Sequence, residues 1–308
     1  MVYDAIIIGG SFSGMAAALQ LARARRKVLV LDAGQPRNRF AAHSHGVLAQ
    51  DGRAGSDILL DAAAQLKAYP TAQIYRCNAT AVSREGGELV VEVDGGARWF
   101  TGRRVLLATG VRDELPPIPG LRERWGVTVM HCPYCHGYEL DAGAIGVLGV
   151  SPLSVHQALL VSDWGDVTFF TDGKLNPDAD ERDMLARRKV KIEPMGVAAI
   201  EGDAGDALDV RLLDGRRVTL RGLFVGSRVE VASTLAQGLG CEIEETPQGH
   251  IIKTGPDKQT TVPGVYAAGD TGQMMQSITM AMSDGVFAGI NMHRSLIWEE
   301  ANGEYVVA

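Results

Sequence analysis

The feature that most constrains this chain of 308 residues is a β-α-β pattern that occurs twice. In the first copy, residues 3–8 form a short apolar, β-branched run, which predicts a buried parallel strand. A glycine-rich turn follows at 9–14, and the Ala-, Leu- and Arg-rich residues 15–25 favour a helix. Residues 27–32 predict a second strand that ends in an acid.

The same order returns in residues 144–148, 149–154, 155–164 and 167–172. In both copies, the opening glycine and the closing acid are 23 positions apart: Gly9 and Asp32, then Gly149 and Asp172. An internal match of this kind is stronger than either motif alone, and it predicts two nucleotide-type β-α-β units in one α/β chain.

The first turn has the residues that a dinucleotide-binding loop requires. Small residues at Gly9, Ser11 and Gly14 let backbone N–H groups approach a pyrophosphate, whose charge the following helix N-terminus favours. Asp32 is placed to accept a ribose hydroxyl. Ser11 replaces the usual second glycine, and a tight turn that only packs a core strand remains the alternative.

Two later strand ends extend this interpretation. One strand runs into Thr109 and Gly110, and another into Gly269 and Asp270, whose carboxylate suits the ribityl or phosphate region of a flavin. The stiff, Pro-rich stretch 113–121 indicates a boundary between domains. We therefore expect an FAD domain split by an insertion, with segments at 1–113, 114–243 and 244–308.

Composition narrows the function classes. The chain is 46% apolar and 22% charged, which is a globular profile, and its net charge of −7 argues against a general nucleic-acid or anionic-membrane binder. No apolar run is long enough to span a membrane, and the N-terminus lacks the features of a signal peptide. With four cysteines we expect a cytoplasmic protein and not a disulfide scaffold.

The stretch 131-HCPYCHGYE-139 contains C-x-x-C-H, which allows three interpretations. It can attach a haem, although no export signal is present. It can hold a zinc ion with ligands drawn from the flanking His131 and His136 or from His43 and His45, although a structural zinc site usually shows a second ligand pair. It can also be a redox dithiol, whose thiolate a helix N-terminus would stabilise. We expect no metal, and we expect Cys77 and Cys241 to be inert buried thiols.

The motifs GGSFSG, LLATG, an inserted C-x-x-C, VPGVYAAGD and QSIT, in this order over nearly the whole chain, resemble the low-molecular-weight thioredoxin reductases. The resemblance implies two doubly wound Rossmann-type domains, the second inserted into the first, with FAD in the first, and a homodimer. It also implies a Cys132–Cys135 redox disulfide in which Cys132 attacks substrate and Cys135 faces the flavin. Gln276 would lie against the flavin ring. Trp298 and Tyr305 are candidates for packing on a partner subunit.

His136 stands where many members of that family have an aspartate that moves protons. An imidazole can do this near neutral pH. The C-x-x-C-H form resembles a subgroup, the thioredoxin-reductase-like dithiol oxidases, which close disulfides in small molecules. The catalytic set implied is Cys132, Cys135 and His136, acting on a thioredoxin-like protein or a small dithiol or disulfide.

The second glycine turn, with Gly149, Ser151 and Ser154, occupies the place of the NADPH site in the resembled family. There, an arginine pair binds the 2′-phosphate. Here Asp172 would repel that phosphate, and Lys174 is a weak substitute for the arginine pair. We therefore expect poor NADPH binding, and electron exchange with oxygen, a dithiol, ferredoxin or another flavin. The alternatives are an NAD(P)H-dependent thioredoxin-disulfide reductase and a flavin-binding redox sensor with little turnover.

Overall fold

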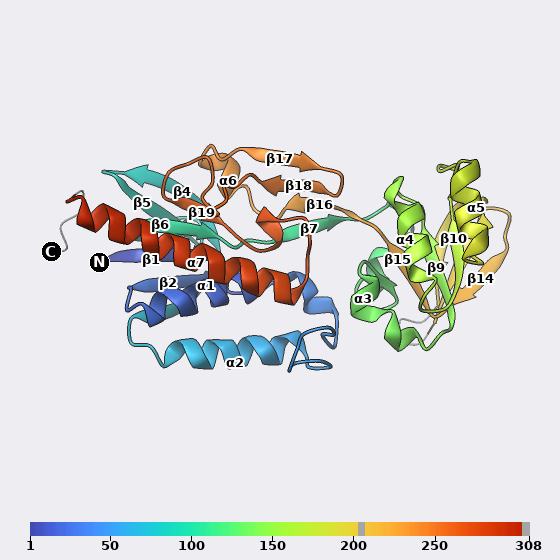
Figure 1. Cartoon of the computed structure of the whole chain (residues 1–308), viewed down its shortest axis with the longest axis horizontal. Helices are drawn as coiled ribbons and strands as arrows, with labels where there is room; N and C mark the ends of the chain where they lie inside the picture. The colour runs from blue at the N-terminus through green and yellow to red at the C-terminus, as the bar shows by residue number, and fades with distance from the viewer. Residues whose placement is uncertain (203–206, 304–308) are drawn as a thin grey trace. The chain divides into compact units, whose positions relative to one another are not determined.

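The computed structural model describes residues 1–202 and 207–303, so Tyr305 lies outside the described residues. The chain forms two compact units (Figure 1). The first comprises Met1–Arg39, Ser56–Arg112 and Val229–Ala308, and the second comprises Phe40–Gly55 and Asp113–Arg228. The second unit therefore ends before the boundary expected at residue 243, because Leu235 and Cys241 pack in a core of the first unit.

The first unit is built on a sheet of order β3-β2-β1-β6-β5-β4, with β19 also pairing with β6. Its strands are β1 (Val2–Ile8), β2 (Val28–Asp32), β3 (Ala72–Arg76), β4 (Ala79–Glu85), β5 (Glu88–Val93), β6 (Arg98–Leu107) and β19 (Val265–Ala267). The strands β3, β2, β1, β6 and β19 run parallel, whereas β5 is antiparallel to β6 and to β4.

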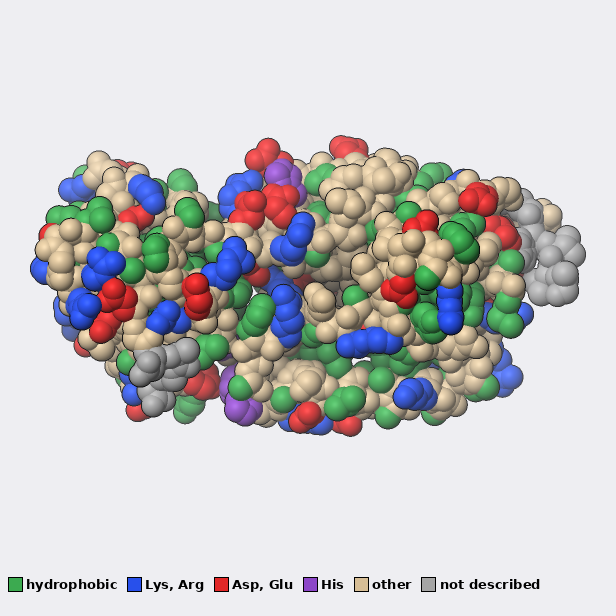
Figure 2. All heavy atoms as spheres, turned by 180° about the vertical axis from the view of Figure 1, so that it is seen from behind, with side chains coloured by type: hydrophobic (Ala, Val, Ile, Leu, Met, Phe, Trp, Pro, Cys, Tyr) green, Lys and Arg blue, Asp and Glu red, His purple; other side chains and the backbone are tan. Residues whose placement is uncertain are grey.

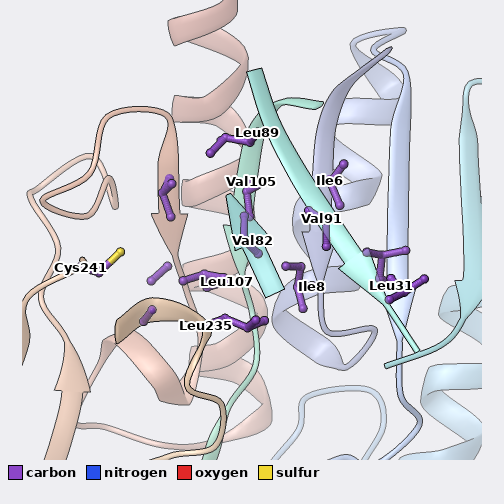
Figure 3. Close-up of a cluster of buried hydrophobic side chains, with 14 of the residues drawn as sticks. Ile6, Ile8, Leu31, Val82, Leu89, Val91, Val105, Leu107, Leu235 and Cys241 are labelled. Atoms are coloured by element: carbon purple, nitrogen blue, oxygen red, sulfur yellow. The ribbon is translucent and has the colours of Figure 1, made fainter. Parts of the chain in front are cut away.

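Both faces of this sheet are buried, which explains why its strands read as continuous apolar runs. Side chains alternate along β1, so Ala5 and Ile7 face one core while Ile6 and Ile8 face the other. Figure 3 shows the second of these cores, where Ile6 and Ile8 meet Val91 of β5 and other side chains from β4, β5 and β6.

Helices α1 (Phe12–Arg23), α2 (Gly55–Lys67) and α7 (Ile278–Ala301) supply the core that includes Ala5 and Ile7, and Figure 1 shows them on one side of the sheet. The core that includes Ile6 and Ile8 also contains side chains of β4, β5 and the short helix α6 (Leu235–Gly238). The remaining elements of this unit and its connections are η1 (Arg37–Phe40), β7 (Val111–Glu114), β16 (Arg228–Val231), β17 (Ile243–Thr246), β18 (Gly249–Ile252) and η4 (Asp270–Gly272).

The second unit repeats this plan on a smaller scale. Its five-stranded sheet has the order β11-β10-β9-β15-β8, with every pair parallel. The strands are β8 (Val129–Met130), β9 (Ala144–Leu148), β10 (Asp166–Phe170), β11 (Lys191–Glu193) and β15 (Gly222–Val225). Helices α4 (Leu153–Val161) and α5 (Ala179–Arg187) pack on one face, and the antiparallel strands β12 (Val197–Glu201), β13 (Leu208–Leu212) and β14 (Arg217–Leu220) on the other. Short helices η2 (Arg122–Arg124), α3 (Pro133–His136) and η3 (Tyr138–Leu140) complete the unit.

The predicted α/β class and both β-α-β units are confirmed, as β1-α1-β2 and β9-α4-β10. One detail was wrong: β10 ends at Phe170, so Asp172 does not end a strand. It lies in a turn with a left-handed backbone (φ +53°). Among the described residues, no helix has the length and apolarity of a membrane span. The charged side chains of both signs are interspersed on the face shown in Figure 2.

Candidate active site

Three loops of the first unit meet at one edge of its sheet. Because β1 and β19 both pair in parallel with β6, the loops that follow these strands leave from the same edge. Gly9 has φ +115°, and a Cβ placed on it would overlap the carbonyl oxygen of Ala108 and lie 3.4 Å from the nitrogen of Thr109. The glycine loop therefore packs directly against the predicted Thr109–Gly110 segment, and glycine is required at position 9.

Two further glycines permit close approach at this edge. A Cβ on Gly14 would overlap the carbonyl oxygen of Gly9, and one on Gly269 (φ +80°) would lie 2.8 Å from the Cβ of Ser13. The loop after β19 therefore lies against the first turn of α1. The structure brings the predicted residues Gly9, Gly14, Thr109 and Gly269 together at the carboxyl ends of parallel strands, where α/β proteins bind ligands.

Unpartnered polar groups gather in the same unit. Ser11 is the N-cap of α1, but its side chain makes no capping hydrogen bond. The hydroxyl oxygens of Ser13 and Thr271 and the amide nitrogens of Gln273 and Gln276 are buried without a hydrogen-bond partner in the protein. Buried polar atoms are nearly always paired in native proteins, so these groups fit a polar ligand such as the phosphate and ribityl parts of FAD.

Asp32 lies at the end of β2, as predicted, and lines a hollow of about 410 Å³ with Ala33, Gln35, Arg76, Cys77 and Asn78. One carboxylate oxygen accepts the N–H of Gly34 at 2.9 Å, and the other accepts Nη1 of Arg76 at 2.6 Å. The Arg76 side chain is largely exposed, at 69%. It can therefore move away and leave the Asp32 carboxylate to a ribose hydroxyl.

Arg37 joins two of the predicted residues and was missed by the sequence analysis. Its Nη1 lies 3.1 Å from a carboxylate oxygen of Asp270 and 2.5 Å from Oε1 of Gln276. The guanidinium thus fixes the Gln276 amide so that its nitrogen is the buried atom without a partner. The only sequence signal was position, since Arg37 lies in the loop that follows the Asp32 strand.

The C-x-x-C segment folds as the redox interpretation requires. Cys132 is the N-cap of α3 and Pro133 its first residue. Cys132 and Cys135 form a disulfide, with their Cα atoms 5.3 Å apart. Tyr134, between them, is 71% exposed and meets the Trp164 ring edge-on at 5.3 Å. A Cβ on Gly137 would lie 2.7 Å from the Trp164 ring, so Trp164 packs closely on the end of this short helix.

His136 is largely buried in the second unit, and the ionisable side chains of Glu139 and His45 act on it. Burial lowers its pKa from the usual value, Glu139 opposes that shift, and His45 adds to it. Its imidazole is therefore neutral at pH 7 and able to accept a proton. His45, from the segment 40–55, lies 3.5 Å from a carboxylate oxygen of Glu139 and 3.7 Å from one of Asp51. His43 is exposed, with its ring 6.5 Å from that of His45.

The other two cysteines have no redox partner in the structure. Cys77 and Cys241 are buried free thiols, as predicted. Burial, together with Asp94 and Asp32, raises the pKa of Cys77 to about 11, and burial also raises the pKa of Cys241. Both are therefore poor nucleophiles. Within residues 1–202 and 207–303, no group of three or more His, Cys, Asp or Glu side chains is placed to hold a metal ion.

In the second glycine loop, residues 149–154, the side chain of Ser154 occupies the backbone N–H groups of the loop. Oγ of Ser154, which is 1% exposed, accepts the backbone N–H groups of Val150 at 3.1 Å and Ser151 at 3.3 Å. These are N–H groups that a dinucleotide loop offers to a pyrophosphate. Here they are already satisfied within the protein.

Asp172 has a different role from the one expected. Its side chain is 7% exposed, one oxygen accepts the N–H of Val197 at 2.6 Å, and the other lies 2.5 Å from Nζ of Lys174. The carboxylate therefore holds the turn after β10 to β12. Its charge is partly balanced by Lys174, so it repels a nearby phosphate less than the sequence alone suggested.

Comparisons with known proteins place this geometry in a wider group. Residues 3–285 match the model of the pyridine nucleotide-disulphide oxidoreductase family. The chain is 30% identical to thioredoxin reductase tcpT of Claviceps purpurea, over 98% of this chain and 97% of that protein. An oxidoreductase from Agrobacterium tumefaciens is 49% identical, with a TM-score of 0.93 over 97% of this chain and 99% of that one. The crystal structure of HlmI is 38% identical, with a TM-score of 0.90 over 98% and 95% of the two chains.

Proposed function

Since the chain belongs to the pyridine nucleotide-disulphide oxidoreductase family, we propose that it is an FAD-dependent dithiol–disulfide oxidoreductase that works without NADPH. The family makes it a flavin-dependent oxidoreductase acting on sulfur groups, with FAD as its cofactor. The observation that carries the proposal is the Cys132–Cys135 disulfide, next to a histidine that is neutral at pH 7.

We assign the FAD site to the edge where the three loops of the first unit meet. The backbone of Gly9, Ser11 and Gly14 would hold the pyrophosphate, and Asp32 the ribose. Thr109, Gly110, Gly269 and Asp270 would line the ribityl and phosphate region, with the Gln276 amide, held by Arg37, toward the ring. Bound FAD supplies a two-electron acceptor or donor for the dithiol pair.

The sulfur chemistry belongs to the pair itself. A substrate thiolate attacks Sγ of Cys132, the Cys132–Cys135 bond breaks, and a mixed disulfide forms. The second substrate thiol then displaces Cys132, leaving a substrate disulfide and two protein thiols. We assign Cys135 to the flavin side of the pair, and His136 donates and accepts the proton of Cys135. The same steps in reverse order reduce a substrate disulfide with the same residues.

The second glycine loop supports NADPH-independence. A pyrophosphate at this loop would have to displace Ser154 from two backbone N–H groups, because its buried hydroxyl already accepts both. We propose that the β9-α4-β10 unit is retained as the scaffold of the C-x-x-C segment. Electrons would then be exchanged with oxygen, a dithiol, ferredoxin or another flavin.

An NAD(P)H-dependent thioredoxin-disulfide reductase is the second candidate. The family description and the name of the Claviceps purpurea relative favour it. Both candidates act on a thioredoxin-like protein or a small dithiol or disulfide, and they differ in the electron donor or acceptor. The cytoplasmic location and the redox-sensor alternative stay predictions.

We propose a homodimer formed through α7. Met280, Phe287, Ile290, Ile297 and Trp298 fall on one face of this helix and are 41–65% exposed. A row of exposed apolar side chains on one helix face is typical of a surface that another chain covers. In sedimentation velocity, Phe287→Asp should convert a dimer into a monomer; a monomeric wild-type protein would contradict the proposal.

The function is tested with Cys135→Ser. Removing the flavin-side sulfur should abolish dithiol oxidation, while flavin stays bound because the FAD residues are untouched. Cys241→Ser is the matched control and should keep full turnover, since Cys241 is a buried free thiol of raised pKa that does not line the hollow around Asp32. Full turnover in Cys135→Ser would overturn the proposal.

A further inference from the structure

The loop between β19 and α7, which carries residues assigned to FAD, is fixed at its start. The N–H of Gly269 donates to one carboxylate oxygen of Asp284, in α7, at 2.9 Å, and Nζ of Lys258 lies 2.9 Å from the other oxygen. Lys258 also donates to the carbonyl oxygen of Gly272 at 3.3 Å. Because both charged side chains are 12% exposed, a largely buried ion pair holds the backbone at this end of the loop.

Arg37 contacts the side chains of the same loop from a segment far away in the sequence. Its Nη1 lies 3.1 Å from Oδ2 of Asp270 and 2.5 Å from Oε1 of Gln276. A guanidinium only donates hydrogen bonds, so the atom of the Gln276 amide that faces it must be the oxygen. The amide nitrogen is left for another acceptor, and it is buried without a hydrogen-bond partner in the protein.

A continuous series of contacts connects Gln276 to the edge where FAD is assigned. A Cβ on Gly269 would lie 2.8 Å from the Cβ of Ser13, in the first turn of α1. Asp270 follows Gly269 in the chain, and Arg37 joins Asp270 to Gln276. The buried amide nitrogen therefore lies in the same part of the unit as the buried hydroxyl of Ser13, which also lacks a partner.

We propose that Arg37 is a positioning residue that sets the reduction potential of the flavin, because it holds the Gln276 amide with its N–H groups available to the ring. The inference rests on the proposed function and deepens it. A hydrogen bond to the ring strengthens when reduction makes the acceptor atom more negative. A fixed donor therefore raises the potential, which favours electron flow from a dithiol to the flavin.

Without Arg37, the Gln276 amide loses the contact that selects its orientation. Turning the amide over exchanges its oxygen and nitrogen with little change in shape, and the oxygen has no hydrogen to donate to the ring. The effect is on a side chain alone, because the ion pair of Lys258 and Asp284 holds the loop backbone independently. We therefore expect substitutions of Arg37 to change the potential while the loop keeps its place.

Arg37→Met tests this role, since methionine has a similar length and no donor. The flavin midpoint potential is measured against a reference dye during slow anaerobic reduction, which needs no dithiol. We expect the equilibrium constant for flavin reduction to fall about tenfold, the size of one hydrogen bond, which corresponds to about 30 mV for a two-electron couple. Arg23→Met is the control, because Arg23 is exposed in the last turn of α1. An unchanged potential in Arg37→Met would overturn the inference.

A double-mutant cycle separates orientation of the amide from a simple effect of charge. Gln276→Leu removes the donor and should lower the potential by a similar amount. In that background, Arg37→Met should change the equilibrium constant by less than about threefold, because there is no amide left to orient. An effect of Arg37→Met that is equally large in both backgrounds would mean that Arg37 acts through its charge alone, and the inference would be wrong.

A structure of the FAD-loaded wild-type protein tests the same point without a variant. We expect Nε2 of Gln276 within hydrogen-bond distance of the flavin ring while Oε1 stays on Arg37; a Gln276 amide out of reach of the ring would overturn the inference. If a dithiol does not reduce the wild-type flavin, the proposed function itself fails, and the dye titration still tests Arg37. If wild type reacts with a dithiol and Arg37→Met keeps its potential, only the role of Arg37 fails.

Discussion

Gly14 and Ser154 occupy the same position in the two glycine loops, each five residues after the loop's opening glycine. At position 14, the missing side chain lets α1 pack against the carbonyl of Gly9. At position 154, a hydroxyl turns back and accepts two N–H groups of its own loop. The repeated fold therefore carries one open loop and one closed loop.

Gly14→Ala should weaken flavin binding. The new Cβ would overlap the Gly9 carbonyl and push α1 away from the loop, and such overpacking typically costs about 1–3 kcal/mol. FAD should then bind roughly 10- to 100-fold more weakly. The ratio of flavin to protein absorbance after gel filtration measures this. Gly238→Ala, where a Cβ meets no atom within 4 Å, should keep its flavin; equal flavin retention in both variants would contradict the assigned site.

Ser154→Ala should destabilise the fold. Two backbone N–H groups lose their acceptor, which costs about 1 kcal/mol and lowers Tm by roughly 2–4 °C for a unit of this kind. Thermal unfolding followed by circular dichroism measures the change. Ser151→Ala leaves both N–H groups bonded to Ser154 and should change Tm much less. An unchanged Tm in Ser154→Ala would mean that the loop gains nothing from its closure.

Stability should fall in mild acid because of His136. Burial lowers its pKa in the folded state, whereas the unfolded chain has a pKa of about 6.5. Below about pH 6.5, the unfolded state binds a proton that the folded state still excludes, so stability drops as pH falls from that value to the lower folded pKa. Urea midpoints at pH 7.5 and 5.5 should differ less in His136→Asn than in wild type. Equal differences would show that this histidine is not buried as described.

Glu300 should contribute stability that disappears in strong acid. Hydrogen bonding to Arg26, aided by Arg103, lowers the pKa of Glu300 from its usual 4.5 to about 2. Because the folded state lowers this pKa, the ionised Glu300 stabilises the fold at pH values above the pKa of the unfolded chain. This stabilisation is lost as the pH falls toward about 2. Glu300→Gln should therefore cost roughly 2–3 kcal/mol at pH 7 and little near pH 2.

Urea unfolding at several pH values checks this expectation. Glu85→Gln, at an exposed position, is the control and should change stability by less than about 0.5 kcal/mol. A loss in Glu300→Gln that persists undiminished near pH 2 would indicate lost packing and not a lost ion pair.

The sequence predicted the fold well because its signals are local. The strand at 3–8, the glycine loop and the helix after it form one continuous segment, and periodicity and turn residues suffice to identify it. The pairing of Cys132 with Cys135 was implied by a family resemblance and is present in the structure.

The sequence did not predict the contacts that join segments far apart in the chain. Arg37 reaches Gln276, and Ser227 links Asp113 to His131, yet no spacing in the chain indicates either contact. The second loop shows a related limit. Sequence reasoning gave most weight to the charge of Asp172, whereas the structure shows that side chain bonded to Val197 and shows Ser154 closing the loop.

We propose that a dithiol, and not NADPH, exchanges electrons with this flavoprotein. The direct test is to add each reductant in turn to the purified yellow protein under anaerobic conditions and to record the flavin absorbance. We expect NADPH to leave the spectrum unchanged, a simple dithiol to bleach it, and the colour to return when air is admitted. Prompt bleaching by NADPH would contradict the claim and identify an ordinary pyridine-nucleotide-dependent reductase.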